Sequence, residues 1–128
     1  MIALRKILVV DDEPDISSSV KRGLERNGFQ VDAYIDPEKA LSEFKPGIYD
    51  LLLVDIRMPK LNGFELYREI KKRNDHAKVC FFTAFEVYYD EFKKVFPTLD
   101  VKCFIRKPIT ISDLVVHINA ELNNKWSI

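Results

Sequence analysis

Residues 51–63 read LLLVDIRMPKLNG, and this stretch contains the most apolar candidate strand of the chain. Four consecutive apolar residues, Leu51–Val54, are typical of a short strand that is buried on both faces of a parallel sheet. Asp55 follows this run directly, so the strand is expected to end in a carboxylate. Asn62 is well placed to cap a helix whose apolar side carries Phe64, Leu66, Tyr67 and Ile70. The stretch therefore predicts one strand–helix unit with polar residues between its two elements.

The same alternation of strand and helix patterns extends to both sides of this unit. The other strands are expected at Lys6–Val10, Phe29–Tyr34, Val79–Phe82 and Val101–Ile105. The other helices are expected from Pro14 to about Gly28, from Pro37 to about Pro46, from about Glu86 to Phe96, and from Ile111 to Leu122. This alternation predicts an α/β fold, a doubly wound sheet of five parallel strands with helices on both faces.

Length and composition limit the classes of protein to which the chain can belong. At 128 residues it fits one domain, residues 1–128, with a core from about residue 5 to residue 122. Lys plus Arg and Asp plus Glu number 20 each, whereas domains that bind nucleic acid directly usually carry a basic excess. No run approaches the roughly 18 consecutive apolar residues of a membrane span. We therefore expect neither direct nucleic-acid binding nor a membrane-bound chain.

The chain contains two cysteines, Cys80 and Cys103, whose spacing is not that of a metal site. Small apolar thiols inside strand patterns are more often buried core residues than members of a disulfide or a redox pair. The sequence thus favours two separate core thiols. Together with the missing apolar region of a signal peptide, this favours a cytoplasmic location.

Reactive polar side chains follow four of the five expected strands. Asp11 and Asp12 follow the first strand, Asp55 the third, Thr83 the fourth and Lys107 the fifth. In open α/β sheets, sites form at the carboxyl ends of the strands. If the first, third, fourth and fifth strands are neighbours, all of these side chains meet at one edge of the sheet.

Such a group of side chains has a definite chemistry. Three close carboxylates repel one another, and a divalent cation relieves the repulsion. Mg²⁺ prefers oxygen ligands, whereas transition metals more often bind His or Cys, and neither His76 nor His117 follows a strand. A carboxylate can also accept a phosphoryl group, a reaction in which the protein mostly positions groups and neutralises charge. Aspartates that merely cap helices would explain each carboxylate singly, but not the whole group.

Four segments in this order resemble the receiver domains of two-component response regulators. They are VVDDE (9–13), DIRMPKLNG (55–63), FTA (82–84) and RKPI (106–109). The resemblance spans essentially the whole chain and implies a flavodoxin-like sheet with strand order 2-1-3-4-5. It also implies that Asp55 is the phosphoryl acceptor. Asp12, Asp11 through a bound water, and the backbone carbonyl of Arg57 would join Asp55 in holding Mg²⁺.

The resemblance further implies a conformational switch. Lys107 would pair with a phosphoryl oxygen, and Pro108 would follow it through a cis peptide bond. Thr83 would move its hydroxyl towards the phosphoryl group, and Phe104 would then rotate inward. Two departures bear on this switch: the segment from Thr83 to Lys107 is longer than usual, and Val101–Cys103 replaces the small pair that commonly precedes the aromatic residue.

The implied function is a phosphorylation-dependent signalling switch that catalyses only its own phosphorylation and slow dephosphorylation. A sensor histidine kinase would donate the phosphoryl group. The face formed by the fourth helix, fifth strand and fifth helix would then bind an unknown protein target, or a second copy of the chain in a homodimer. A wide aromatic stripe supports an interface on the fourth helix: Phe85, Tyr88, Tyr89, Phe92, Val95 and Phe96.

Two other functions remain open from the sequence. A receiver fold can serve as a docking or oligomerisation module without phosphorylation, and binding of beryllofluoride with Mg²⁺ would distinguish this case. A Mg²⁺-dependent phosphatase with an aspartyl intermediate needs a second carboxylate just after the nucleophile as acid and base. Ile56 and Arg57 occupy those positions, so the sequence argues against a phosphatase.

Overall fold

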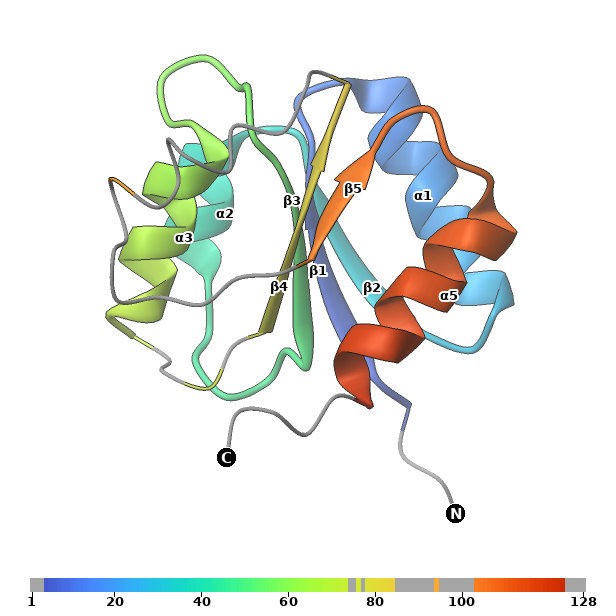
Figure 1. Cartoon of the computed structure of the whole chain (residues 1–128). Helices are drawn as coiled ribbons and strands as arrows, with labels where there is room; N and C mark the ends of the chain where they lie inside the picture. The colour runs from blue at the N-terminus through green and yellow to red at the C-terminus, as the bar shows by residue number, and fades with distance from the viewer. Residues whose placement is uncertain (1–3, 74–75, 77, 85–93, 95–102, 124–128) are drawn as a thin grey trace.

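The computed structural model describes residues 4–73, 76, 78–84, 94 and 103–123. Its centre is a sheet of five parallel strands in the order β2-β1-β3-β4-β5 (Figure 1). The strands are β1 (Lys6–Val10), β2 (Gln30–Tyr34), β3 (Leu51–Asp55), β4 (Lys78–Thr83) and β5 (Phe104–Arg106). The predicted α/β fold and strand order are confirmed, and the fold is flavodoxin-like.

The described helices lie in two layers, one on each face of the sheet (Figure 1). They are α1 (Pro14–Arg26), α2 (Pro37–Glu43), α3 (Gly63–Lys71) and α5 (Ile111–Leu122). Helices α1 and α5 cover one face, while α2 and α3 cover the other. The fourth helix and its aromatic stripe, expected at about Glu86–Phe96, lie outside the described residues, apart from Lys94. Within the described ranges, no helix has both the length and the apolar character to cross a membrane.

The core has two halves because successive side chains of a strand point to opposite faces of the sheet. In β3, Leu52 and Val54 face α2 and α3, whereas Leu51 and Leu53 face α1 and α5. All five residues of β3 are buried, as the apolar run at 51–54 predicts for a strand in the middle of a parallel sheet. The register aligns Val10 of β1 with Val54, so the two strands end side by side.

The helix boundaries follow the local signals in the sequence. Pro14 and Pro37 occupy the first turns of α1 and α2, where the missing N–H of proline costs no hydrogen bond. Asn62 caps α3 in a capping box, in which its side chain accepts from the Glu65 N–H and the Glu65 carboxylate accepts from the Asn62 N–H. Thr110 caps α5, which has the bounds that the sequence predicts.

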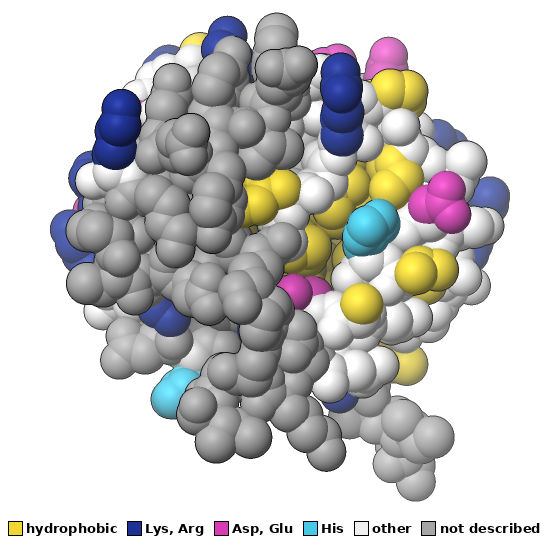
Figure 2. Space-filling model, viewed as in Figure 1, with side chains coloured by type: hydrophobic (Ala, Val, Ile, Leu, Met, Phe, Trp, Pro, Cys, Tyr) yellow, Lys and Arg dark blue, Asp and Glu magenta, His cyan; other side chains and the backbone are white. Residues whose placement is uncertain are grey.

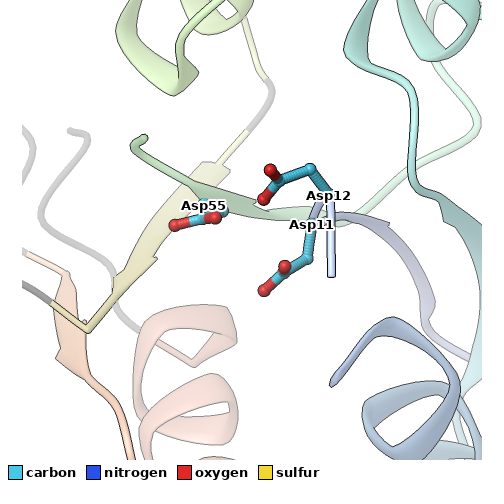
Figure 3. A group of neighbouring side chains, drawn as sticks. All are labelled: Asp11, Asp12 and Asp55. Carbon is cyan, nitrogen blue, oxygen red and sulfur yellow. The ribbon is translucent and has the colours of Figure 1, made fainter. Parts of the chain in front are cut away.

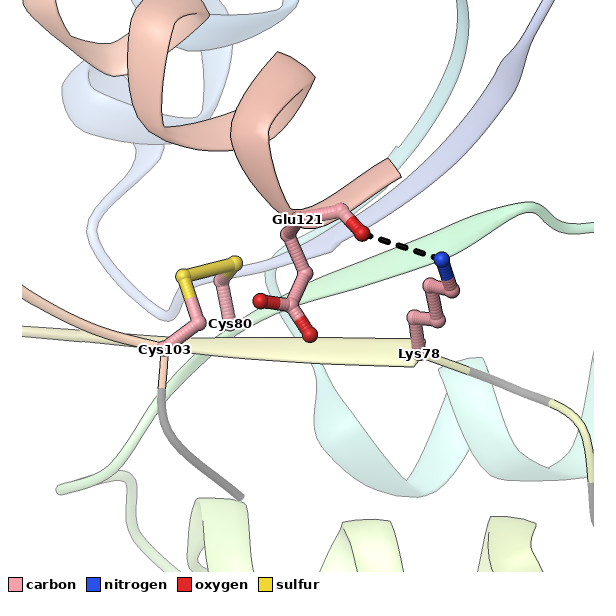
Figure 4. Close-up of a disulfide and its surroundings, with 4 residues drawn as sticks. All are labelled: Lys78, Cys80, Cys103 and Glu121. Atoms are coloured by element: carbon pink, nitrogen blue, oxygen red, sulfur yellow. Dashed lines mark hydrogen bonds between the residues drawn. A yellow bond between two sulfur atoms is a disulfide. The ribbon is translucent and has the colours of Figure 1, made fainter. Parts of the chain in front are cut away.

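The expectation of two separate thiols was wrong, because Cys80 and Cys103 are joined by a disulfide (Figure 4). Both residues are buried, as expected. Phe81 of β4 pairs with Phe104 of β5, so the residues just before them lie opposite each other on adjoining strands. This pairing depends on the register between two distant strands, which spacing along the chain does not reveal. The cytoplasmic location stays a prediction, without the support that free thiols would have given it.

Candidate functional site

Three carboxylates meet at the carboxyl edge of the sheet, as the sequence predicts. Asp11 and Asp12 follow β1, and Asp55 ends β3 (Figure 3). Each offers a ligand oxygen that lies within 4.8 Å of the other two, so the group could hold one metal ion, directly or through its water. Asp11 is 1% exposed and Asp55 5%, whereas Asp12 is half-buried. The set consists of hard oxygen ligands alone, which suits Mg²⁺ or Ca²⁺ better than a transition metal.

Lys107 brings a buried positive charge to the same carboxylates. Its Nζ lies 2.6 Å from Asp11 Oδ2 and 3.8 Å from Asp55 Oδ2. The ring of Phe82 supports the ammonium group from one side, with 4.7 Å between Nζ and the ring centroid. The backbone fixes the lysine as well, since its N–H donates to the carbonyl oxygen of Thr83 (2.8 Å), and the next peptide bond, Lys107–Pro108, is cis as the resemblance implies.

The Asp55 carboxyl has an unusual affinity for protons. Its pKa is raised to about 7, chiefly by burial and also by the neighbouring Asp11 and Asp12, while the charge of Lys107 acts in the opposite direction. A cation between the carboxylates would favour the ionised form of Asp55. The carboxylate oxygens are also the nucleophilic atoms of an aspartate, so a cation held here would lie beside a group that can act as a nucleophile.

The loop after β3 holds Asp55 in place through a glycine to which the sequence analysis gave no role. The Gly63 N–H donates to the carbonyl oxygen of Ile56 (2.8 Å). A Cβ at position 63 would overlap the backbone carbonyl of Asp55, so only glycine allows the start of α3 to pack this closely against the end of β3. The DIRMPKLNG motif ends in this glycine, but the contact itself is visible only in three dimensions.

The remaining predicted residues lie near this edge, with different exposures. Thr83 is 1% exposed at the end of β4, next to the pair formed by Asp55 and Phe82. Arg57 lies two residues after Asp55 and exposes its side chain. Phe104 is half-buried at the start of β5, where its ring stacks on Phe81 with 5.6 Å between the centroids. Phe81 and Thr83 alternate with Phe82 along β4, so Thr83 and Phe104 share one face of the sheet.

Other proteins with this architecture are known. The family model of the response regulator receiver domain matches residues 7–119. Among curated proteins, the response regulator ArlR of Staphylococcus saprophyticus is 30% identical over 122 residues, which cover 95% of this chain and 54% of ArlR. The transcriptional regulatory protein PrrA of Mycobacterium tuberculosis is 29% identical over 122 residues, 95% of this chain and 52% of PrrA. The chain thus spans about half the length of these relatives.

Solved structures agree with the sequence comparison. A response regulator receiver domain protein from Clostridium thermocellum is 32% identical, with a TM-score of 0.78 over 94% of this chain and 95% of that one. The response regulator TrrA from Thermotoga maritima, solved in complex with Mg²⁺ and BeF, is also 32% identical, with a TM-score of 0.77 over 91% of this chain and 97% of its own. Since the family model covers most of the sequence, the chain belongs to the response regulator receiver domains of two-component signalling systems.

Proposed function

We propose that the chain is a phosphorylation-dependent switch in which Asp55 accepts a phosphoryl group from a sensor histidine kinase. The observation that carries the proposal is the placement of the Asp55 carboxylate between two acidic neighbours and a buried lysine. Asp55 thus has both a possible cation site and a fixed positive charge beside it. Phosphoryl transfer needs this combination, because its transition state carries negative charge on several oxygens at once.

Mg²⁺ is the proposed cofactor. Asp12 and Asp55 would bind it directly, Asp11 through water, and the backbone carbonyl of Arg57 would complete the protein's share of ligands. The fit rests on a set of oxygen ligands small enough for one ion. TrrA, solved with Mg²⁺ and BeF, gives independent support. When bound, the ion supplies positive charge to the carboxylates and to a phosphoryl oxygen.

The residues of this chain would divide the chemistry as follows. An Asp55 oxygen forms a bond to phosphorus while the bond from phosphorus to the donor's histidine nitrogen breaks, and that nitrogen keeps the electron pair. The Lys107 ammonium pairs with one phosphoryl oxygen, and the Thr83 hydroxyl donates to another. Hydrolysis of the aspartyl phosphate reverses the switch. The chain has no other catalytic task in this proposal, and signalling is the established role of its family.

The kinase must bring its phosphohistidine to the carboxyl edge of the sheet, so it must contact the chain next to Lys107. An apolar hollow of about 370 Å³ opens there between α1 and α5, and its lining includes Ile16, Lys107, Pro108 and Ile111. A hollow of this kind gives a protein donor apolar surface to bury close to the acceptor. The kinase is therefore the partner proposed for this side of the molecule.

The conformational change that follows phosphorylation would be transmitted by Thr83 and Phe104. Thr83 would move towards the phosphoryl group, and Phe104 would rotate into the space that Thr83 leaves. The position of the two residues on one face of the sheet supports this coupling. The altered surface would comprise β5, α5 and the segment between β4 and β5, and it would bind a protein target or a second copy of the chain.

Labelling with a small phosphodonor tests the proposal directly. Purified protein incubated with acetyl phosphate and Mg²⁺ should gain the mass of one phosphoryl group, and neither Asp55→Asn nor wild-type protein in EDTA should gain it. Binding of beryllofluoride with Mg²⁺ should follow the same pattern. Wild-type protein that binds neither reagent would instead be a docking or oligomerisation module that works without phosphorylation.

A further inference from the structure

The disulfide between Cys80 and Cys103 lies outside the acidic site and has no part in the proposed phosphoryl transfer. The two residues continue the register in which Phe81 pairs with Phe104 and Phe82 with Ile105. Their Cα atoms are 4.6 Å apart, and the Phe81 N–H donates to the carbonyl oxygen of Cys103 at 2.9 Å. The strand ladder alone therefore keeps the two side chains opposite each other, whether or not the sulfur atoms are bonded.

The surroundings of the pair can hold the bonded and the unbonded form. Cys80 and Cys103 belong to the half of the core beneath α5, together with Ile105, Leu114, Ile118 and Leu122. Free thiols are small, weakly polar groups that pack well among such side chains. Lys78, two residues before Cys80, donates to the backbone carbonyl of Glu121 (3.0 Å, Figure 4) and to that of Leu122 (3.1 Å), which ties the end of α5 to the same strand. Opening the disulfide therefore leaves α5 anchored above it.

The two cysteines differ slightly in exposure. Cys80 is 0% exposed on β4, which has a neighbour on each side, whereas Cys103 is 9% exposed beside β5, the three-residue strand at the edge of the sheet. Hydrophobic side chains are visible on the surface in the region of β5 and α5 (Figure 2), and Val116 of α5 is 65% exposed. These exposures favour attack by a small reagent from the side of Cys103.

We propose that Cys80 and Cys103 form a reversible thiol–disulfide site that responds to small thiols and small disulfides. A thiolate attacks the Cys103 sulfur and forms a mixed disulfide, while Cys80 leaves as a thiolate and takes up a proton. A second thiol then releases the Cys103 thiol. Overall, two small thiols are oxidised to one small disulfide and the protein disulfide is reduced to two thiols; a small disulfide reverses the reaction.

The redox state governs how firmly β5 is held. The disulfide joins residues 23 positions apart and thereby closes the chain that connects β4 to β5 into a covalent loop. Phe104, the proposed switch residue, directly follows Cys103. When the bond opens, a short ladder between β4 and a three-residue strand must hold the edge of the sheet. Reduction therefore loosens β5, and an effect of this loosening on signalling rests on the proposed function.

Hydrogen exchange measured by mass spectrometry tests this site in the intact chain. Protein prepared in air is compared with protein treated with dithiothreitol under native conditions, and alkylation after unfolding counts the free thiols. We expect the thiol count to rise from zero to two without unfolding, and oxidised glutathione to reverse it. Exchange in the peptide 103–109 should become about tenfold faster on reduction, while exchange in the β1 peptide 6–10 stays constant.

Free thiols in air-prepared protein that oxidised glutathione leaves free would overturn the proposal, and so would reduction only at denaturant concentrations that unfold the chain. The Cys80→Ala/Cys103→Ala variant should exchange like the reduced protein, with or without dithiothreitol. Labelling by acetyl phosphate separates the two proposals. Its absence in both redox states would count against the phosphoryl switch alone, whereas equal exchange in both states would count against the thiol site alone.

Discussion

The ammonium group of Lys107 lies 1.2 Å closer to Asp11 than to Asp55, with distances of 2.6 and 3.8 Å to the respective Oδ2 atoms. Both side chains of the short pair are buried, with Asp11 at 1% and Lys107 at 7% exposure. The lysine thus neutralises a proposed metal ligand first and the proposed acceptor second. A phosphoryl group on Asp55 would attract the ammonium group away from Asp11. The position of Lys107 would therefore depend on whether Asp55 is phosphorylated.

Lys107→Met should therefore affect metal binding and phosphoryl transfer in opposite directions. The variant keeps an aliphatic side chain but removes a cation that competes with Mg²⁺ for Asp11. At pH 9, well above the pKa of about 7 that Asp55 has in the wild type, we expect Mg²⁺ to bind about tenfold more tightly in calorimetric titrations. Labelling by acetyl phosphate should become about a hundredfold slower, because the charge beside the transferred group is lost.

Lys72→Met is the matched control, since Lys72 forms an exposed ion pair with Glu69 on α3 at 2.7 Å. It should change neither quantity. Weaker Mg²⁺ binding in Lys107→Met would show that the lysine organises the carboxylates instead of competing for them.

Stability should depend on pH through Asp55. Its pKa is raised to about 7 in the folded chain, whereas an aspartate in an unfolded chain titrates near pH 4. Between these two values the folded state holds a proton that the unfolded state has lost. The free energy of unfolding in EDTA should therefore fall as the pH rises from about 4 to about 7, and this contribution should level off above pH 7.

Urea unfolding of wild type and Asp55→Asn across this pH range measures the effect. The variant has no carboxyl at position 55 and should lose this part of the slope, so that it becomes the more stable protein near pH 8 without metal. Mg²⁺ should stabilise the wild type at pH 8, because it binds the folded state and favours the ionised carboxylate. Parallel pH curves for the two proteins would contradict the raised pKa.

Gly63→Ala should displace Asp55, the proposed acceptor, although Gly63 is not one of the charged residues of the site. The added Cβ would overlap the backbone carbonyl of Asp55, and backbone cannot yield as a flexible side chain does. We expect a loss of about 2 kcal/mol in the free energy of unfolding, together with slower labelling, because Asp55 shifts relative to Asp11 and Asp12. Urea unfolding and the acetyl phosphate assay measure the two effects.

Gly28→Ala provides the comparison for Gly63→Ala. Gly28 has φ +89°, but a Cβ there would meet nothing within 4 Å. Its replacement should cost about 1 kcal/mol through backbone strain and leave labelling unchanged. Equal labelling in the two glycine variants would remove Gly63 from the positioning of Asp55.

The parts of the structure that the sequence predicts are those with a local cause. The apolar run at 51–54 is enough to predict a central strand, and the amphipathic pattern of residues 111–122 is enough to predict α5. The meeting of Asp11 with Asp55 also follows, because parallel strands present their carboxyl ends at one edge. The roles of these residues came from the resemblance to receiver domains.

The features that the sequence misses arise from contacts between distant segments. The fifth strand is expected at Val101–Ile105; residues 101 and 102 lie outside the described residues, Cys103 is not in a strand, and β5 runs from Phe104 to Arg106. Without the register between β4 and β5, nothing in the sequence aligns Cys80 with Cys103. The contact of Gly63 with Asp55 and the preference of Lys107 for Asp11 likewise depend on how two elements pack.

Thr83 should separate phosphorylation from its consequence. The residue is 1% exposed, and its backbone carbonyl, which accepts from the Lys107 N–H, does not depend on the side chain. Thr83→Ala should therefore keep the site assembled and be labelled by acetyl phosphate within a few-fold of the wild-type rate. The hydroxyl that would contact the phosphoryl group is missing, so Phe104 should keep its position.

Hydrogen exchange measures this consequence. In wild type, beryllofluoride with Mg²⁺ should change exchange in the β5 peptide 103–109. In Thr83→Ala that change should disappear, while Thr83→Ser, which keeps the hydroxyl, should retain it. An undiminished response in Thr83→Ala would mean that the signal leaves the acidic site by a path that bypasses Thr83.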